Sequence, residues 1–143
     1  MDINTFINRI VGEAYNVSYA FRQIAVVLRQ LIQDSNAKHI LYPKGLFIKD
    51  SNEEVYIFES NGVMRFSVKD HSVSVETWKY LDIQKLELSL SPRNNQHNKT
   101  LSICFSNGDV IKLDSCNDTN DHWSHNYAEK LLELFQWLRS YAK

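Results

Sequence analysis

Residues 101–141 read LSICFSNGDVIKLDSCNDTNDHWSHNYAEKLLELFQWLRSY. The first part alternates apolar and polar residues, with Leu101, Ile103 and Phe105 on one side of an expected strand, and Asn107-Gly108 favours a tight turn into a second strand. In the later part, apolar residues follow steps of four and three: Trp123, Tyr127, Leu131, Leu134, Leu138 and Tyr141. These steps are the period of a helix with one buried face. The stretch therefore predicts a β-hairpin followed by a closing helix that covers a sheet.

Residues 45–91 alternate with the period of two that is typical of strands. Short polar segments, including Asn61-Gly62 and Asp70-His71, separate the apolar runs and predict antiparallel pairing of neighbouring strands. The expected strands are 45–49, 54–60, 63–69, 72–78, 83–91, 100–106 and 110–113. In the strand at 83–91, Leu86, Leu88 and Leu90 are expected to point inward, and Tyr42-Pro43-Lys44-Gly45 predicts a loop ahead of the first strand. Seven strands with one apolar face bend or split into two packed sheets. We interpret residues 37–143 as one α+β domain: a seven-stranded antiparallel bent sheet, or partly open barrel, capped by the C-terminal helix.

Residues 1–36 form the second expected part, a long N-terminal helix over Asn4–Gln33. Its apolar residues repeat every seven positions: Ile3, Ile7, Ile10, Ala14, Val17, Phe21, Ile24, Leu28 and Leu31. Such a repeat is compatible with packing on the body of the same chain and with pairing to a second copy. Because further apolar residues lie beside this seam, we expect a homodimer or a protein partner, with Phe21 and Leu28 in the contact.

Four aromatic residues lie off the predicted core face or near strand ends: Tyr56, Phe58, Trp78 and Tyr80. The simplest interpretation is that the N-terminal helix covers them. If it does not, they form an exposed apolar patch and therefore a partner-binding surface.

The composition narrows the range of partners. The 143 residues carry a formal net charge of −1, so no overall basic field attracts nucleic acid or anionic lipid. Two cysteines do not make a disulfide framework. The first residues lack the features of a signal peptide, and no apolar run approaches the ~20 residues that span a bilayer. We expect a cytoplasmic protein without nucleic acid or integral membrane association.

The order of seven strands and a closing helix resembles the pleckstrin-homology-like superfold, which includes the bacterial PH and GRAM-type domains. The resemblance covers roughly residues 45–142 and rests on this order, on the run Ile83-Gln84-Lys85-Leu86-Glu87-Leu88, which looks like the family's central strand, and on the hairpin that leads into the helix. It implies a binding module rather than an enzyme, and some members bind peptides beside the closing helix.

Members that bind phosphoinositides use Lys and Arg in the first loop between strands. Here residues 49–54 read KDSNEE, and three acidic residues would repel a phosphorylated headgroup, so we do not expect phosphoinositide binding.

Chemistry at a metal or thiol site is an alternative to an interaction module. His122 and His125 are spaced to share one side of a helix, and Cys116 is close in sequence. A polar capping loop with two exposed histidines explains the same residues, because no second metal-binding motif accompanies them. No catalytic motif occurs, and we expect no cofactor. Peripheral membrane binding is a third hypothesis, which the near-neutral charge disfavours.

Overall fold

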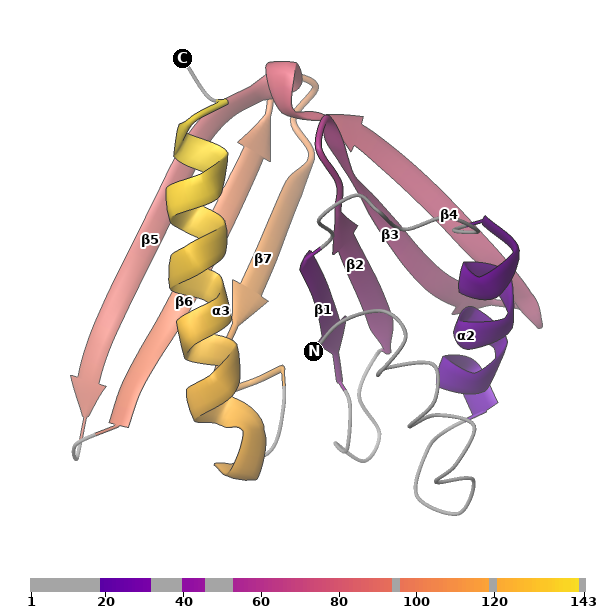
Figure 1. Cartoon of the computed structure of the whole chain (residues 1–143), viewed down its shortest axis with the longest axis horizontal. Coiled ribbons are helices and arrows are strands. Elements are labelled where there is room, and N and C mark those ends of the chain that lie inside the picture. The colour runs from indigo at the N-terminus through magenta and orange to yellow at the C-terminus, as the bar shows by residue number, and fades with distance from the viewer. Residues whose placement is uncertain (1–18, 32–39, 46–52, 94–95, 119–120, 142–143) are drawn as a thin grey trace. The chain divides into compact units, whose positions relative to one another are not determined.

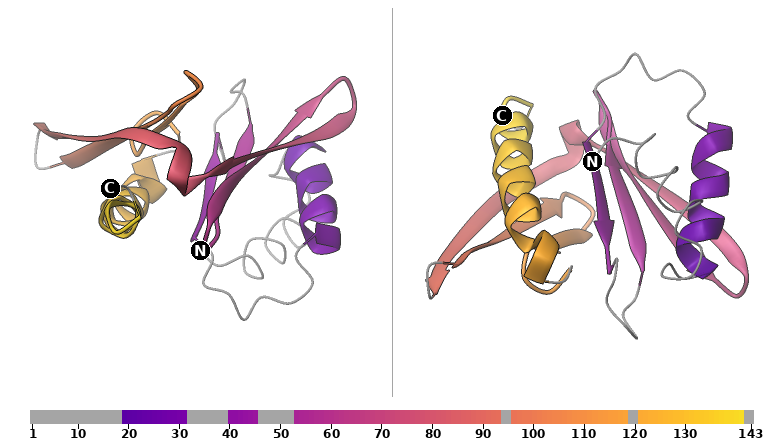
Figure 2. Two further views of the ribbon diagram at one scale, coloured as in Figure 1. Left: turned by 90° about the horizontal axis from the view of Figure 1, so that it is seen from above. Right: turned by 60° about the horizontal axis from the view of Figure 1, so that its bottom comes forward.

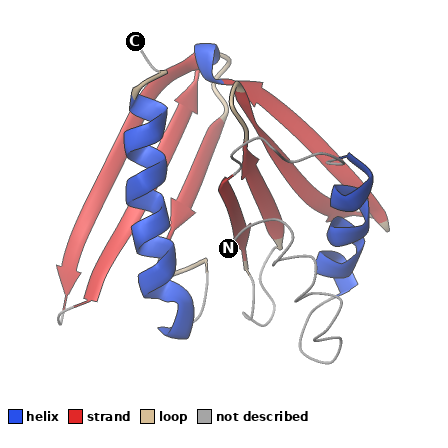
Figure 3. Cartoon of the chain, viewed as in Figure 1, coloured by secondary structure: helices blue, strands red, loops and turns tan. Residues whose placement is uncertain are grey.

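The computed structural model describes residues 19–31, 40–45, 53–93, 96–118 and 121–141. Its elements are α2 (Tyr19–Leu31), β1 (Ile40–Lys44), β2 (Glu54–Phe58), β3 (Gly62–Lys69), β4 (Ser72–Lys79), the short 3₁₀ helix η1 (Tyr80–Asp82), β5 (Ile83–Arg93), β6 (Gln96–Phe105), β7 (Val110–Asp114) and α3 (Asp121–Arg139) (Figure 1). Figure 3 shows the same elements by type. The chain divides into two compact units, Met1–Trp78 and Lys79–Lys143. In the described residues, each unit holds one sheet and one α-helix that packs on it.

The sheet of the first unit is a four-stranded antiparallel meander in the order β1-β2-β3-β4. Its register places Tyr42 of β1 opposite Tyr56 of β2, and Tyr56 opposite Arg65 of β3. Between β3 and β4, Asp70 and His71 have φ values of 50° and 66°. Two successive residues in the left-handed region match the twist of the flanking strands, and they keep this hairpin tight.

Helix α2 covers one face of this sheet, as Figure 2 shows from two further directions. Its buried side chains pack with those of β1, β2 and β3 in one core cluster: Phe21, Ile24, Ala25, Leu28, Leu41, Val55, Ile57 and Phe66. Side chains alternate across a strand, so Tyr56 and Phe58 of β2 point to the other face from Val55 and Ile57. Helix α2 therefore lies on the aliphatic face of β2.

The second unit is the three-stranded sheet β5-β6-β7 with α3 on one face (Figures 1 and 2). Buried apolar side chains of β6, β7 and α3 form its core: Leu101, Ile103, Phe105, Ile111, Leu113, Tyr127, Ala128, Leu131, Leu134 and Leu138. At the end of α3, the rings of Tyr80, Trp137 and Tyr141 meet with centroid distances of 5.2–5.5 Å. These edge and tilted contacts fix the last turn of α3 against η1.

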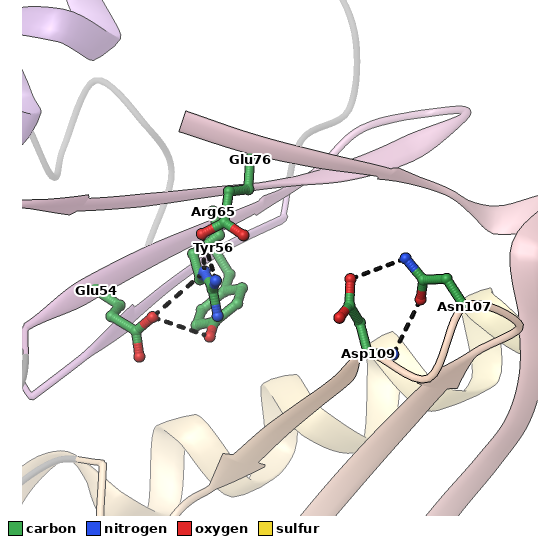
Figure 4. Close-up of polar contacts among 6 residues, drawn as sticks. All are labelled: Glu54, Tyr56, Arg65, Glu76, Asn107 and Asp109. Carbon is green, nitrogen blue, oxygen red and sulfur yellow. Dashed lines mark hydrogen bonds and ion pairs between the residues drawn. The ribbon is translucent and has the colours of Figure 1, made fainter. Parts of the chain in front are cut away.

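Side-chain hydrogen bonds hold the turn between β6 and β7 and the loop between β7 and α3. In the β6–β7 turn, the Asp109 N–H donates to Asn107 Oδ1 at 2.9 Å and Gly108 has a φ of 95°, which favours glycine (Figure 4). After β7, the Cys116 N–H donates to Asp114 Oδ1 at 2.8 Å, while the Asp114 N–H donates to Asp118 Oδ2 at 2.7 Å. These hydrogen bonds from backbone N–H groups to carboxylate oxygens hold the loop that precedes α3.

The structure confirms the α+β class, the antiparallel pairing and the closing helix. The one continuous seven-stranded sheet is not confirmed, because the strands form separate sheets of four and three that do not close. The loop expected at Tyr42–Gly45 is wrong, since β1 covers Ile40–Lys44. Proline fits there because β1 is an edge strand. Leu90, expected to point into the core, is 62% exposed.

The long N-terminal helix is described only over α2, which has 13 residues. Residues 4–18 and 32–33 of the expected helix lie outside the described residues, as do the expected domain boundary at residues 36–37 and most of the strand expected at 45–49. No described helix combines the length and the hydropathy needed to cross a bilayer.

Candidate interaction surfaces

A polar cluster lies on the face of the first sheet opposite α2 (Figure 4). Arg65 Nε donates to Glu76 Oε1 at 3.0 Å and lies 3.5 Å from Glu54 Oε2. A second ion pair joins Arg65 Nη2 to Glu76 Oε1. The guanidinium carbon lies 5.2 Å from the centroid of the Trp78 ring, and the Tyr56 hydroxyl lies 3.4 Å from Glu54 Oε2. The cluster therefore links β2, β3 and β4 through side chains.

Burial and charge shift two pKa values in this cluster. Burial, with the negative charge of Glu54 adding to it, raises the pKa of Tyr56 from 10.0 to about 12. Burial alone would lower the pKa of Arg65. The hydrogen bonds that Arg65 donates to Glu76 and Tyr56 outweigh that effect and raise the pKa of Arg65 above its usual value. Tyr56 is therefore a neutral hydroxyl and Arg65 a fixed cation at physiological pH.

The chemistry of the cluster is that of a structural link. Both carboxylates engage the same guanidinium, and the arrangement contains no nucleophile next to a base. Ser67 Oγ is buried beside β2 and lacks a hydrogen-bond partner within the described part of the chain. The contacts of the cluster therefore hold the three strands together.

The residues expected to bind a partner are mostly buried within the chain. Phe21 and Leu28 are 1% and 0% exposed and lie in the core cluster under α2. The strand and η1 aromatics Tyr56, Phe58 and Tyr80 are also buried, and Trp78 is half-buried beneath Arg65. A partner has no access to the five buried residues in this conformation. Their role in partner binding stays a prediction, and exposed residues offer a better candidate surface.

The opposite side of α2 supplies such a surface. We define the outer face of α2 as Tyr19, Arg22, Val26 and Arg29, all of which are exposed. Tyr19 and Val26 are 66% and 59% exposed. These residues were not among those predicted to bind a partner, although their steps of three and four opposite the Phe21–Leu28 seam are visible in the sequence.

The alternative metal or thiol site gains no geometric support. Cys116 is exposed, and His125 Nε2 lies 3.2 Å from Glu129 Oε1 in an exposed contact. His122 lies in the first turn of α3. Among the residues that the structure describes, no group of three or more His, Cys, Asp or Glu side chains could hold a metal ion.

Comparison with models of protein families identified the family of this chain. The model of a family described as "Protein of unknown function (DUF3908)" matches residues 6–129. The chain belongs to the DUF3908 family. Comparisons with curated proteins and with solved structures gave no significant match. The DUF3908 match includes residues of both units, and it covers the described strands of both sheets and the first nine residues of α3.

Proposed function

We propose that this DUF3908 chain is a non-catalytic protein-interaction module that binds its partner through the outer face of α2. One observation carries the proposal: Tyr19 and Val26 are exposed apolar side chains on a helix whose other side is fully used by the core. A helix needs only one apolar face to pack on its sheet, so a second exposed apolar stripe favours a contact with another molecule.

The charges on α2 indicate the chemistry of that partner. The helix reads YAFRQIAVVLRQL and contains no acidic residue. Arg22 and Arg29 flank Val26, and neither takes part in an ion pair within the described ranges. A protein segment with an apolar side chain between carboxylates would match this face. Packing two copies of α2 against each other would instead bring arginines together, which disfavours self-association through this helix.

We also propose that the fold is pleckstrin-homology-like. Support comes from the order of elements, which is a four-stranded meander, a three-stranded meander and a C-terminal helix. Domains of this kind are typically binding modules, which agrees with an interaction role. Because one fold supports many functions, the proposed interaction role rests on the outer face of α2.

Site-specific photocrosslinking tests the proposal. A photoreactive amino acid replaces Val26 in the full chain, in the cells that naturally make it, and a matched chain carries the same group at Leu132, an exposed apolar position on α3. We expect a discrete protein adduct at position 26 and none at position 132. A pattern that is the same at both positions would contradict the proposal.

Binding of the purified partner then tests the charges. We expect Arg22→Glu with Arg29→Glu to weaken the affinity at least about tenfold, which corresponds to ~1.4 kcal/mol. The control carries Lys69→Glu and Lys79→Glu, the same charge change at exposed positions outside α2. Equal affinity of both double variants would exclude the outer face of α2 as the contact. Binding to anionic vesicles that depends on Arg22 and Arg29, without a protein adduct at position 26, would favour the membrane hypothesis instead.

A further inference from the structure

The tripeptide Ser-Asn-Gly occurs twice in the chain, each time where one antiparallel strand leads into the next. Ser60-Asn61-Gly62 connects β2 with β3, and Ser106-Asn107-Gly108 connects β6 with β7. Both asparagines are exposed. Because the two tripeptides are identical, a difference in the reactivity of their asparagines has to come mainly from the structure that surrounds them.

An asparagine that precedes a glycine can lose its side-chain amide in water. The backbone nitrogen of the glycine gives up its proton and attacks the side-chain carbonyl carbon of the asparagine. The new C–N bond closes a five-membered succinimide ring, and the amide nitrogen takes up a proton and leaves as ammonia. One water molecule then opens the ring at either carbonyl, which gives aspartate or isoaspartate. Glycine favours the first step because it has no Cβ to hinder its nitrogen and because its backbone reaches the required conformation easily.

Hydrogen bonds hold both reacting groups of Asn107-Gly108. Asn107 Oδ1 accepts the Asp109 N–H at 2.9 Å, and Asn107 Nδ2 donates to Asp109 Oδ2 at 2.9 Å (Figure 4). The Gly108 N–H donates to the Phe105 carbonyl oxygen at 3.0 Å. The Asn107 side chain therefore loses two hydrogen bonds when it turns toward the Gly108 nitrogen, and that nitrogen loses a third when it gives up its proton.

The side chain of Asn61 is not held in this way. It makes no hydrogen bond within the residues that the structure describes. This turn is closed by the Glu59 N–H, which donates to the Gly62 carbonyl oxygen at 2.9 Å, so Gly62 contributes its oxygen to that contact. The Asn61 side chain can therefore turn toward the Gly62 nitrogen without breaking a hydrogen bond of its own.

We propose that Asn61 is a site of spontaneous modification, which converts to aspartate and isoaspartate in the folded protein and loosens the β2–β3 hairpin, whereas the turn around Asn107 protects that residue. Water is the only co-reactant. The proposal is independent of the outer face of α2, because the reacting atoms all belong to the turn between β2 and β3. Loss of the partner adduct at position 26 would leave the reaction at Asn61 unchanged.

The effect on the hairpin follows from the length of the main chain. Isoaspartate places one additional carbon in the main chain of the turn, and the register of a hairpin depends on the length of its turn. This register sets Tyr56 opposite Arg65 in the polar cluster. The isoaspartate form, isolated by chromatography, should unfold at a lower urea concentration than Asn61→Asp, which carries the same added charge on a main chain of normal length. Equal unfolding midpoints would overturn the effect on the hairpin.

Peptide mass spectrometry on the full chain tests the site itself. The protein is incubated in mildly alkaline buffer, once folded and once in urea, and the converted fraction of each asparagine is followed with time. In urea we expect similar rates at Asn61 and Asn107, because the unfolded chain lacks the hydrogen bonds of the turns. In the folded chain Asn107 should react at least about tenfold more slowly than Asn61.

Two variants separate the turns. Asp109→Ala removes the acceptor of Asn107 Nδ2, so the folded variant should convert Asn107 at least about threefold faster, with no change at Asn61. The rate of the same variant in urea corrects for any effect of the altered neighbour. Asn61→Gln is the matched control, because its longer side chain forms the corresponding ring poorly. It should abolish conversion in the first turn and leave the rate at Asn107 unchanged.

Three results would overturn the assignment of Asn61. They are equal rates at Asn61 and Asn107 in the folded chain, conversion of Asn61 that is suppressed by folding as strongly as that of Asn107, and an Asp109→Ala variant whose folded form converts Asn107 no faster than the wild type.

Discussion

Tyr56 links the stability of the first unit to alkaline pH. Its pKa is raised from 10.0 to about 12 by burial and by Glu54, so the folded state holds the phenolic proton more tightly than the unfolded state. The resulting stability is fully present below about pH 10 and is lost as the pH rises toward 12, by up to ~2.7 kcal/mol over two pH units. We expect Tyr56→Phe to lack this component when urea unfolding is followed from pH 9 to 12. The other tyrosines contribute equally to the wild type and to Tyr56→Phe, so their effect cancels in the comparison. If the free energies of unfolding of the two proteins changed in parallel with pH, the assignment of the effect to Tyr56 would be wrong.

Arg65 should matter more to stability than an exposed charge does. Arg65→Met leaves Glu54 and Glu76 on one face without their shared cation, and we expect a loss of about 1–2 kcal/mol, reduced from the value for a buried pair because Glu76 is partly exposed. Glu129→Gln, which removes the exposed contact with His125, should change the free energy of unfolding by less than about 0.5 kcal/mol. Urea unfolding measures both. Similar losses would show that the cluster is solvated and does not hold the strands together.

Part of this cluster could be predicted from the sequence. Alternation in β2 places Glu54 and Tyr56 on one side, and the Asn61-Gly62 turn brings β3 back alongside. The burial of Tyr56 could not be predicted, because alternation identifies two faces of a strand but not which of them is covered. The same limit explains why Tyr56 and Phe58 were expected on the face that the N-terminal helix covers, whereas α2 packs on Val55 and Ile57.

At the scale of elements, the two sides of α2 should respond differently to truncation. Leu28 is 0% exposed in the core cluster, so Leu28→Ala should cost about 2–5 kcal/mol through lost burial and the cavity left behind. Val26→Ala, on the outer face, should stay within about 0.5 kcal/mol. Chemical denaturation of the two variants measures this difference. A comparable cost at both positions would mean that the outer face is also covered in solution.

The seam of α2 shows what helical periodicity can and cannot predict. The seven-residue repeat correctly selected Phe21, Ile24 and Leu28 as buried, but Leu31, the last residue of the repeat, is 55% exposed. It could not distinguish a sheet from a second helix as the packing partner, because both bury the same stripe. In β1, Pro43 suggested a loop, and only the edge position, which depends on the pairing of distant strands, makes a strand possible there.

At the scale of the whole molecule, the sequence predicted the six strands from β2 to β7 and their order better than their division into sheets. The break falls at η1, Tyr80–Asp82, where one meander ends and the next begins. A turn sequence indicates that the two strands it joins lie side by side. The segment between β4 and β5 is not such a turn, so the sequence does not show whether these two strands share hydrogen bonds. For the same reason, the incomplete cover of Leu90 could not be anticipated, since it depends on how far α3 reaches across the sheet.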